Sequence, residues 1–301
     1  MTIHNLDFLM DLCASGRKMT IAVACPYGDD ALAAVCAARD RNLVNSVLVG
    51  DAEKIRVLAE KDGLSLDGIE IVDEKTDDLA VEKSVKMVSG GDADLLMKGL
   101  VKTATLLKSV LNKEWGLRAG SLLSHLFLQE ITVMGGRIFG LTDGGMNMYP
   151  DLQTKVGIIE NAVECYHKIG VACPMIAALA AVEVVNPDMA CTLDAAALAK
   201  MSDRGQIKGC VVDGPFALDN AVSEEAAKTK GIRSPVAGNA DILLVPNIEC
   251  GNLVGKVMTY LAKERGAGVV LGARKPIVLT SRFDSMETKL LSIALGAVVA
   301  R

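Results

Sequence analysis

The stretch "MTIAVACPYGDDALAAVCAARD", Met19 to Asp40, decides the fold class. It begins with an apolar, β-branched run that ends at a Pro-Tyr-Gly turn, as a buried strand does. The remainder has helical apolar spacing after two acidic residues, whose charge suits the positive end of a helix dipole. The stretch therefore predicts a strand followed by a helix.

The same alternation of strand and helix returns downstream. We predict further strands at 46–49, 69–72 and 95–97, and helices at 52–61, 79–88 and 103–112. Four such units in series predict a parallel sheet covered by helices, hence an α/β fold. The composition agrees, because 50% of residues are hydrophobic and only 3% aromatic, which indicates a core of Ala, Val, Leu, Ile and Met.

The second half of the chain also mixes strands and helices. At 301 residues a chain commonly divides into two domains, and the Gly- and Met-rich segment 135–149 is where we expect the change. Segment 170–185 is compatible with an apolar helix or a strand. We predict strands at 209–212, 241–245, 269–271 and 277–279, and helices at 154–169, 195–202, 217–229 and 254–264.

Charge and hydropathy exclude several classes of protein. A net charge of −5, a single Trp and the absence of a Lys/Arg block argue against a nucleic-acid partner. The longest apolar stretch, 170–185, is interrupted by Pro174 and Glu183, so we expect no membrane partner, and the absence of an export signal predicts a cytoplasmic location. Eight cysteines without a C-x-x-C pair favour reduced, buried thiols over a metal-binding or catalytic cysteine.

The segment "LTSRFDSMETKLLSIALGAVV", Leu279 to Val299, carries the first candidate site. Asp284 and Glu287 match a capping box, which predicts a helix beginning near Asp284. Ser281 and Arg282 would then lie at a strand end beside a helix N-terminus, where backbone N–H groups favour an anion. A guanidinium and a hydroxyl there suit a phosphoryl group. The alternative is that Asp284 only caps the helix and Arg282 only forms a surface ion pair.

Two further segments carry polar residues at predicted element ends. In "LLMKGLVKTATLL", Lys98 ends a strand and Lys102 and Thr103 open a helix, which indicates anion binding or a solvated helix start. In "GLRAGSLLSHLFLQE", His125 is suited to a carbonyl oxygen or a phosphate, or to a satisfied position in the core. The same segment includes Arg118, Ser121 and Ser124.

Glycine-containing polar segments follow. Glycines at 214, 238, 251 and 255 permit close backbone approach to a ligand, although any turn uses glycine as well. The segments are "LTDGGMNMYPD", "VDGPFALDNA" and "RSPVAGNADILLVPNIECGNLVGK".

Taken together, "MKGLVKT", "TDGGMNMYPDL", "DGPFALDNA", "SPVAGNADILLVPN", "CGNLVGK" and "LTSR" resemble the phosphate acetyl/butyryltransferase family over nearly the whole chain, the butyryltransferase branch being the more similar. The resemblance implies the reaction acyl-CoA + phosphate ⇌ acyl phosphate + CoA, with a short acyl chain such as butyryl, CoA as substrate, and neither a metal nor a permanently bound cofactor. It also implies two doubly wound α/β domains with an interdomain cleft, as in isocitrate and isopropylmalate dehydrogenases. On this basis we predict one domain of residues 1–130 plus 276–301, a second of 131–275, and a homo-oligomer.

The resemblance assigns phosphate and CoA contacts to Ser281 and Arg282. Arginines of the acetyltransferase relatives fall near Lys108 and Arg118. Their proposed base, seven residues beyond the serine, is Thr288 here, which leaves Asp284 or Glu287 as substitutes. A cysteine beside the site in some of those relatives has no counterpart, so we expect no acyl-cysteine. The predicted catalytic residues are Ser281, Arg282, Asp284, Lys98 and His125, and the predicted binding residues are Lys102, Thr103, Arg118, Ser121, Asp143, Asn147, Ser234 and Gly238.

Three alternatives stay open on the sequence. A phosphate acetyltransferase differs only in the acyl group. The second alternative is an NAD-dependent dehydrogenase of similar fold. This chain lacks the G-x-G-x-x-G motif of such enzymes after its first strand, where only Gly28 is present. A non-catalytic CoA-binding protein remains, because fold alone does not establish activity.

Overall fold

The computed structural model describes residues 5–301, which form two compact units. The Lys98 unit comprises residues 6–121 and 266–301, and the Asp143 unit comprises residue 5 and residues 122–265. The predicted domain limits at 130 and 275 stay a prediction from the resemblance. Strand 124–131 pairs with strand 137–142 within the Asp143 unit, and Val270 pairs with Ile277 within the Lys98 unit.

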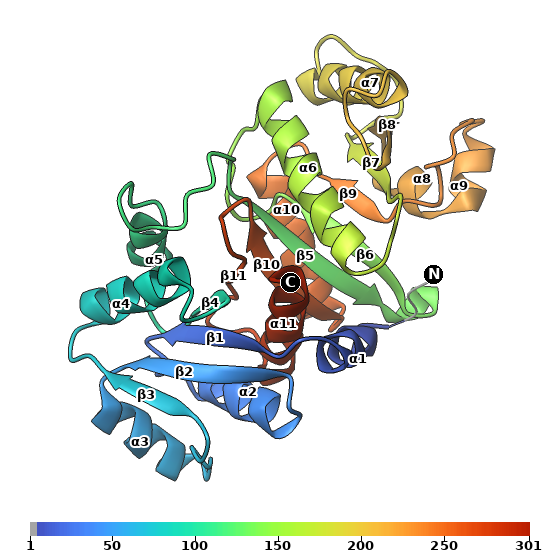
Figure 1. The fold of residues 1–301 in the computed structure, drawn as a ribbon. Coiled ribbons are helices and arrows are strands. Elements are labelled where there is room, and N and C mark those ends of the chain that lie inside the picture. Colours follow the sequence, from blue (N-terminus) through green and yellow to red (C-terminus); the bar gives the residue numbers. More distant parts are fainter. Residues whose placement is uncertain (1–4) are drawn as a thin grey trace. The chain divides into compact units, whose positions relative to one another are not determined.

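The Lys98 unit contains a mixed sheet in the strand order β3-β2-β1-β4-β11-β10, in which only β10 and β11 pair antiparallel. Helices α2 and α11 pack on one face of this sheet, and α4 on the other (Figure 1). The strands are β1 (Met19–Ala24), β2 (Val44–Gly50), β3 (Glu70–Asp73), β4 (Leu95–Lys98), β10 (Arg265–Leu271) and β11 (Ile277–Val278), and the helices are α1 (Asp7–Ser15), α2 (Asp29–Asp40), α3 (Ala52–Lys61), α4 (Asp77–Gly90), α5 (Thr103–Val110) and α11 (Met286–Val299).

Helix α11 forms the centre of the core of this unit. Every residue from Thr288 to Val299 is buried, as expected of a helix that is apolar on all sides. The helix packs against α1 and α2. A Cβ at Gly296 would lie 2.8 Å from Val278 and 3.0 Å from Leu95, so only glycine allows this approach to the sheet. The close packing fixes the start of α11 relative to the strand ends.

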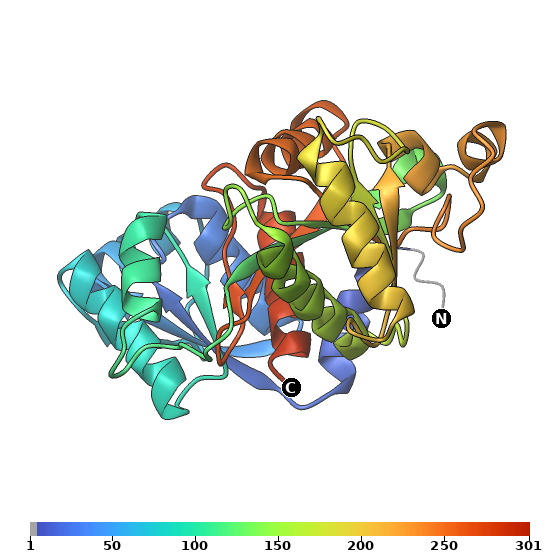
Figure 2. The same ribbon diagram turned by 90° about the horizontal axis from the view of Figure 1, so that it is seen from above.

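The Asp143 unit contains strands in the order β5-β6-β9-β7-β8, with β5 and β6 antiparallel and the other neighbours parallel. Figure 2 shows α6 and α7 side by side over these strands. The strands are β5 (Ser124–Ile131), β6 (Arg137–Thr142), β7 (Met175–Leu179), β8 (Val211–Phe216) and β9 (Ile242–Leu244), and the helices are α6 (Leu152–Lys168), α7 (Ala190–Asp203), α8 (Leu218–Val222), α9 (Glu224–Thr229), α10 (Ile248–Lys256) and the short η1 (Thr132–Met134) and η2 (Val257–Leu261).

Three predicted elements of this unit differ from the structure. The ambiguous segment 170–185 contains only the short strand β7. The predicted helix 217–229 divides at Ser223, which is extended and whose hydroxyl accepts a hydrogen bond from Ala226 N as the cap of α9. The predicted helix 254–264 is the end of α10 followed by one π-helical turn, and the chain then enters β10.

The membrane and thiol predictions can be compared with the described residues. Among residues 5–301, none of the helices combines the length and apolarity needed to cross a bilayer. All eight cysteines are free thiols, and Cys13, Cys25, Cys36 and Cys165 are buried as expected. The expectation of burial is wrong for Cys173 and Cys250, which are exposed.

Candidate active site

The carboxyl ends of three parallel strands meet at one edge of the Lys98 unit. Strand β4 pairs in parallel with β1 on one side and with β11 on the other. A Cβ at Gly99 would lie 2.1 Å from the carbonyl oxygen of Cys25, so glycine is required where the chain leaves β4. The amide of Leu100 donates to that same carbonyl at 2.8 Å. The loops after β1 and β4 are therefore tied together beside the residues that follow β11.

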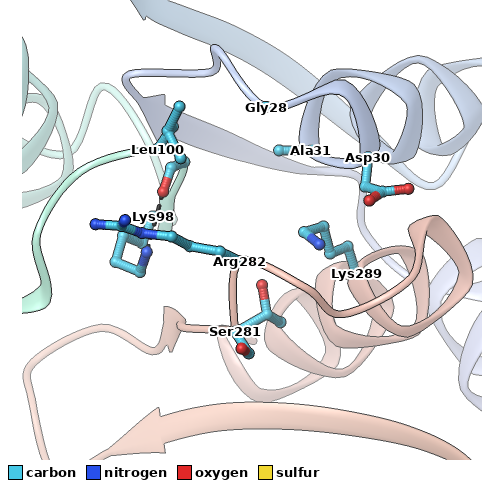
Figure 3. Close-up of a pocket in the computed structure, with 10 residues that line it drawn as sticks. Gly28, Asp30, Ala31, Lys98, Leu100, Ser281, Arg282 and Lys289 are labelled. Carbon is cyan, nitrogen blue, oxygen red and sulfur yellow. Dashed lines mark hydrogen bonds between the residues drawn. The ribbon is translucent and has the colours of Figure 1, made fainter.

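This edge holds a pocket that is open to solvent, drawn in Figure 3. Three cationic side chains line it, together with one exposed carboxylate and the N-terminal residues of α2. Because the cap residue of α2 is Gly28, no side chain caps that helix end, which leaves its positive dipole end toward the pocket. The arrangement favours an anion. The lining residues are Gly28, Asp30, Ala31, Lys98, Gly99, Leu100, Thr280, Ser281, Arg282 and Lys289.

Lys98 lies at the base of this pocket with only 5% of its surface exposed. Its ammonium donates to the carbonyl oxygens of Gly99 at 3.0 Å and Val101 at 3.3 Å. An ammonium has three donors, so one remains for a ligand. Burial lowers the pKa of Lys98, and the neighbouring charges of Arg282 and Lys289 lower it further. Lys98 both holds the loop after β4 and contributes positive charge.

Ser281 and Arg282 are exposed and form the opposite wall of the pocket. The buried carboxylate of Asp284 accepts a hydrogen bond from the backbone N–H of Ser281 at 2.7 Å, and the backbone N–H of Asp284 donates to the Ser281 carbonyl at 3.2 Å. Asp284 therefore fixes the turn that presents Ser281 and Arg282. This contact gives Asp284 a positioning role, and the role of base considered from the sequence stays a prediction.

The predicted capping box at Asp284 and Glu287 is wrong. Helix α11 begins at Met286, and its cap is Ser285, whose hydroxyl accepts from Thr288 N at 3.2 Å. Serine caps as well as aspartate does, and the Asp284 carboxylate is already engaged by Ser281. Thr288, at the position that the resemblance assigns to the base, is buried and does not line the pocket.

Lys289 is a pocket residue that the sequence interpretation missed. It is 4% exposed and donates to the Asp284 carbonyl oxygen. Burial lowers its pKa, while the charges of Asp30 and Asp284 oppose the shift. A cation in the first turn of an apolar helix opposes the helix dipole, and that conflict was the available signal.

Four other predicted residues of the Lys98 unit do not line the pocket. Lys102 and Thr103 open α5 and are exposed, and the Lys102 side chain makes no cap bond. Arg118 forms an isolated β-bridge with Ala273, and Ser121 is exposed. The structure thus brings Lys98 together with Ser281 and Arg282, and leaves these four outside.

Asp143 organises a loop of the other unit. Its buried carboxylate accepts from the backbone N–H groups of Gly145 at 2.9 Å, Met146 at 3.0 Å and Asn147 at 3.2 Å, and from Asn147 Nδ2 at 2.6 Å. Loop 143–147 lies against His125, since a Cβ at Gly145 would be 3.3 Å from the His125 ring. Asp143 therefore shapes the backbone beside His125, and the substrate contact expected of Asp143 from the sequence stays a prediction.

Ser234 and Gly238 lie in a turn of the Asp143 unit. Ser234 Oγ accepts from Val236 N at 3.1 Å. Gly238 has φ +77°, and a Cβ there would lie 2.5 Å from Glu224 N. The Gly238 carbonyl accepts from Arg137 at 2.8 Å. These contacts give both residues a structural function in the turn.

In residues 5–301, no three His, Cys, Asp or Glu side chains gather where they could hold a metal.

Known proteins are similar to this chain over most of its length. A family model described as "Phosphate acetyl/butaryl transferase" matches residues 78–297. The phosphate butyryltransferase of Clostridium acetobutylicum is 51% identical, over 99% of both chains. The phosphate acetyltransferase of Thermotoga maritima is 45% identical, over 98% of this chain and 99% of that protein. The crystal structure of a branched-chain phosphotransacylase from Enterococcus faecalis matches with a TM-score of 0.83 and 32% identity, over 94% of this chain and 99% of that one. The resemblance drawn from the sequence is thereby confirmed, and the chain belongs to the phosphate acetyl/butyryltransferase family.

Proposed function

We propose that this protein transfers a short acyl group, butyryl in preference, between CoA and inorganic phosphate. The observation that carries the proposal is the pocket in which Lys98, Arg282 and Lys289 converge at the ends of β4 and β11. The identity to a phosphate butyryltransferase supports the choice of acyl group. Inorganic phosphate and the phosphoryl end of an acyl phosphate carry the charge that this pocket favours.

The chemistry requires charge stabilisation more than it requires a base. In the forward direction a phosphate oxygen attacks the thioester carbonyl, the C–S bond breaks, and CoA leaves as thiolate. A free thiol has a pKa of about 8.5, so CoA is a good leaving group and is a few per cent ionised at pH 7 in the reverse direction. The harder step is to stabilise the tetrahedral oxyanion. Preorganised hydrogen-bond donors usually make the largest contribution to that stabilisation.

Each residue at the pocket has its own role in this stabilisation. Arg282 offers a planar pair of donors to phosphate oxygens, and the Ser281 hydroxyl offers one more. The Lys98 ammonium adds charge at the base of the pocket. Asp284 holds the Ser281 backbone and so keeps both side chains in place. His125 of the Asp143 unit stays a candidate donor to the acyl oxygen.

The test is a comparison of acyl-CoA substrates in the presence of phosphate. Initial rates are measured with acetyl-, propionyl-, butyryl- and valeryl-CoA from the loss of thioester absorbance, because thiol-reactive dyes would also label the exposed Cys173 and Cys250. We expect the highest kcat/KM with butyryl-CoA. A maximum with acetyl-CoA would favour the phosphate acetyltransferase alternative, and no phosphate-dependent loss with any substrate would reject the function.

The finer features of the family remain part of this proposal. They are two doubly wound domains of the isocitrate dehydrogenase type with a cleft, the domain limits at residues 130 and 275, a homo-oligomer, a cytoplasmic location, and CoA as a substrate with no cofactor bound permanently. Light scattering after size-exclusion chromatography tests the oligomer, and crystals grown with CoA test the domain arrangement. The dehydrogenase alternative is tested by NAD reduction with 2-hydroxy acids, for which we expect no rate.

A further inference from the structure

Lys289 occupies a position that folding alone disfavours. It is the fourth residue of α11, where the helix dipole is positive, and it is 4% exposed. The neighbours Leu290 and Leu291 are buried and apolar. Desolvating an ammonium is costly unless several hydrogen bonds replace the lost water. The Asp284 carbonyl oxygen is one such acceptor for the Lys289 ammonium.

The charges around Lys289 also disfavour a buried ammonium at this position. Lys98 and Arg282 share its pocket, and both Arg282 and Lys289 lower the pKa of Lys98 through like charge. The carboxylates of Asp30 and Asp284 oppose this positive charge. Three cations against two carboxylates, beside the uncapped start of α2, leave the pocket positive when it is empty. An anion in the pocket would remove the conflict.

The side chains reach the pocket from different directions. Arg282 extends toward Lys98 and Leu100, whereas Lys289 lies on the side of Asp30 (Figure 3). A phosphate ion has four oxygens, and one of them must stay available to bond the acyl carbon. A bidentate guanidinium takes two oxygens, and a compact ammonium takes a third.

We propose that Lys289 binds the phosphoryl group on the side opposite Arg282, and so determines which phosphate oxygen remains to attack the acyl carbon. This role rests on the proposed function, because it assigns a ligand within the same pocket. On this proposal the positive charge of Lys289 serves to bind phosphate and does not stabilise the fold.

The test compares three variants with the wild type. Lys289→Met keeps the aliphatic stem and removes the charge, Lys289→Arg keeps the charge, and Lys113→Met makes the same charge change at an exposed lysine away from the pocket. KM is measured separately for inorganic phosphate and for butyryl-CoA. The melting temperature is measured with and without inorganic phosphate, since a ligand that binds the folded state raises it.

We expect Lys289→Met to raise the KM for phosphate by about tenfold or more, with the KM for butyryl-CoA within about twofold of the wild type. Without phosphate, Lys289→Met should melt above the wild type, and phosphate should raise its melting temperature less. Lys289→Arg should recover part of the phosphate response, and Lys113→Met should behave as the wild type. If Lys289→Met does not fold, Lys289→Gln replaces it.

An unchanged KM for phosphate in Lys289→Met overturns the proposal. A lower kcat with both KM values unchanged also overturns it, because that result would place Lys289 at the acyl group. A melting temperature of Lys289→Met below that of the wild type overturns it as well. The two proposals fail separately. If the wild type shows no phosphate-dependent acyl transfer, the function fails, while the phosphate-induced rise in melting temperature still reports on Lys289. If the wild type is active and Lys289→Met matches it, only the role of Lys289 fails.

Discussion

Replacing Arg282 by alanine separates activity from stability. The Arg282 side chain is exposed, and its backbone turn is held by Asp284 through the Ser281 amide. Truncating an exposed side chain changes the free energy of unfolding by no more than about 0.5 kcal/mol. Loss of one preorganised donor to the reacting group costs about 2.7 to 4 kcal/mol in the transition state, which is about 100- to 1000-fold in kcat. The variant should therefore be folded and nearly inactive.

The assay follows phosphate-dependent loss of the butyryl-CoA thioester, with urea unfolding measured in parallel. Arg56→Ala, an exposed arginine on α3 outside the pocket, is the matched control and should keep wild-type rates. Arg282→Lys should recover only part of the rate, because an ammonium lacks the planar pair of donors. A rate for Arg282→Ala within about threefold of the wild type, in a protein of unchanged stability, would remove Arg282 from the transition state.

Three other predictions concern the loop after β4, the loop at Asp143 and the charge of Lys289. Gly99→Ala forces a Cβ to within 2.1 Å of the Cys25 carbonyl, so urea unfolding should show a loss of about 2 kcal/mol or more together with reduced activity, and an unchanged midpoint would contradict the required close approach. Asp143→Ala removes an acceptor of four N–H groups, and we expect the free energy of unfolding to fall by about 3 kcal/mol. A loss below about 1 kcal/mol would contradict this prediction. Burial lowers the folded-state pKa of Lys289 below its ordinary 10.5, so between that lowered pKa and 10.5 the unfolded chain holds more protons and the wild type gains stability as the pH rises. The stability advantage of Lys289→Met should therefore be largest near neutral pH and shrink toward pH 10.5 in urea titrations, and an advantage that grows with pH would refute the sign.

Local patterns predicted most of the Lys98 unit. Helices α2 and α3 begin and end at the predicted residues, because their apolar spacing, acidic starts and flanking turns are all local signals. The β5–β6 hairpin was not predicted as a pair of strands. Its register pairs residues 126–131 with 137–142. The connection, residues 132–136, contains the short η1 and two glycines with positive φ, and residues 135–149 have no clear period of their own.

The site was predictable where strand order fixes it. Lys98 ends β4 and Ser281 follows β11. Because parallel neighbours end at one edge of a sheet, their meeting followed from the topology. Lys289 was missed because its burial depends on how α11 packs against α2, which no local pattern shows. Asp284 was wrongly predicted to cap α11, because aspartate suits both a helix cap and a turn, and only the structure shows Ser285 as the cap.

The most direct test of the anion pocket is crystallographic. Crystals soaked in arsenate, which has the charge and shape of phosphate and an anomalous signal, locate the bound anion without reference to activity. The account predicts an arsenic peak within hydrogen-bonding reach of Lys98, Arg282 and Lys289, beside the start of α2. An empty pocket at a saturating arsenate concentration, with the anion bound only at Lys102 or Arg118, would contradict it.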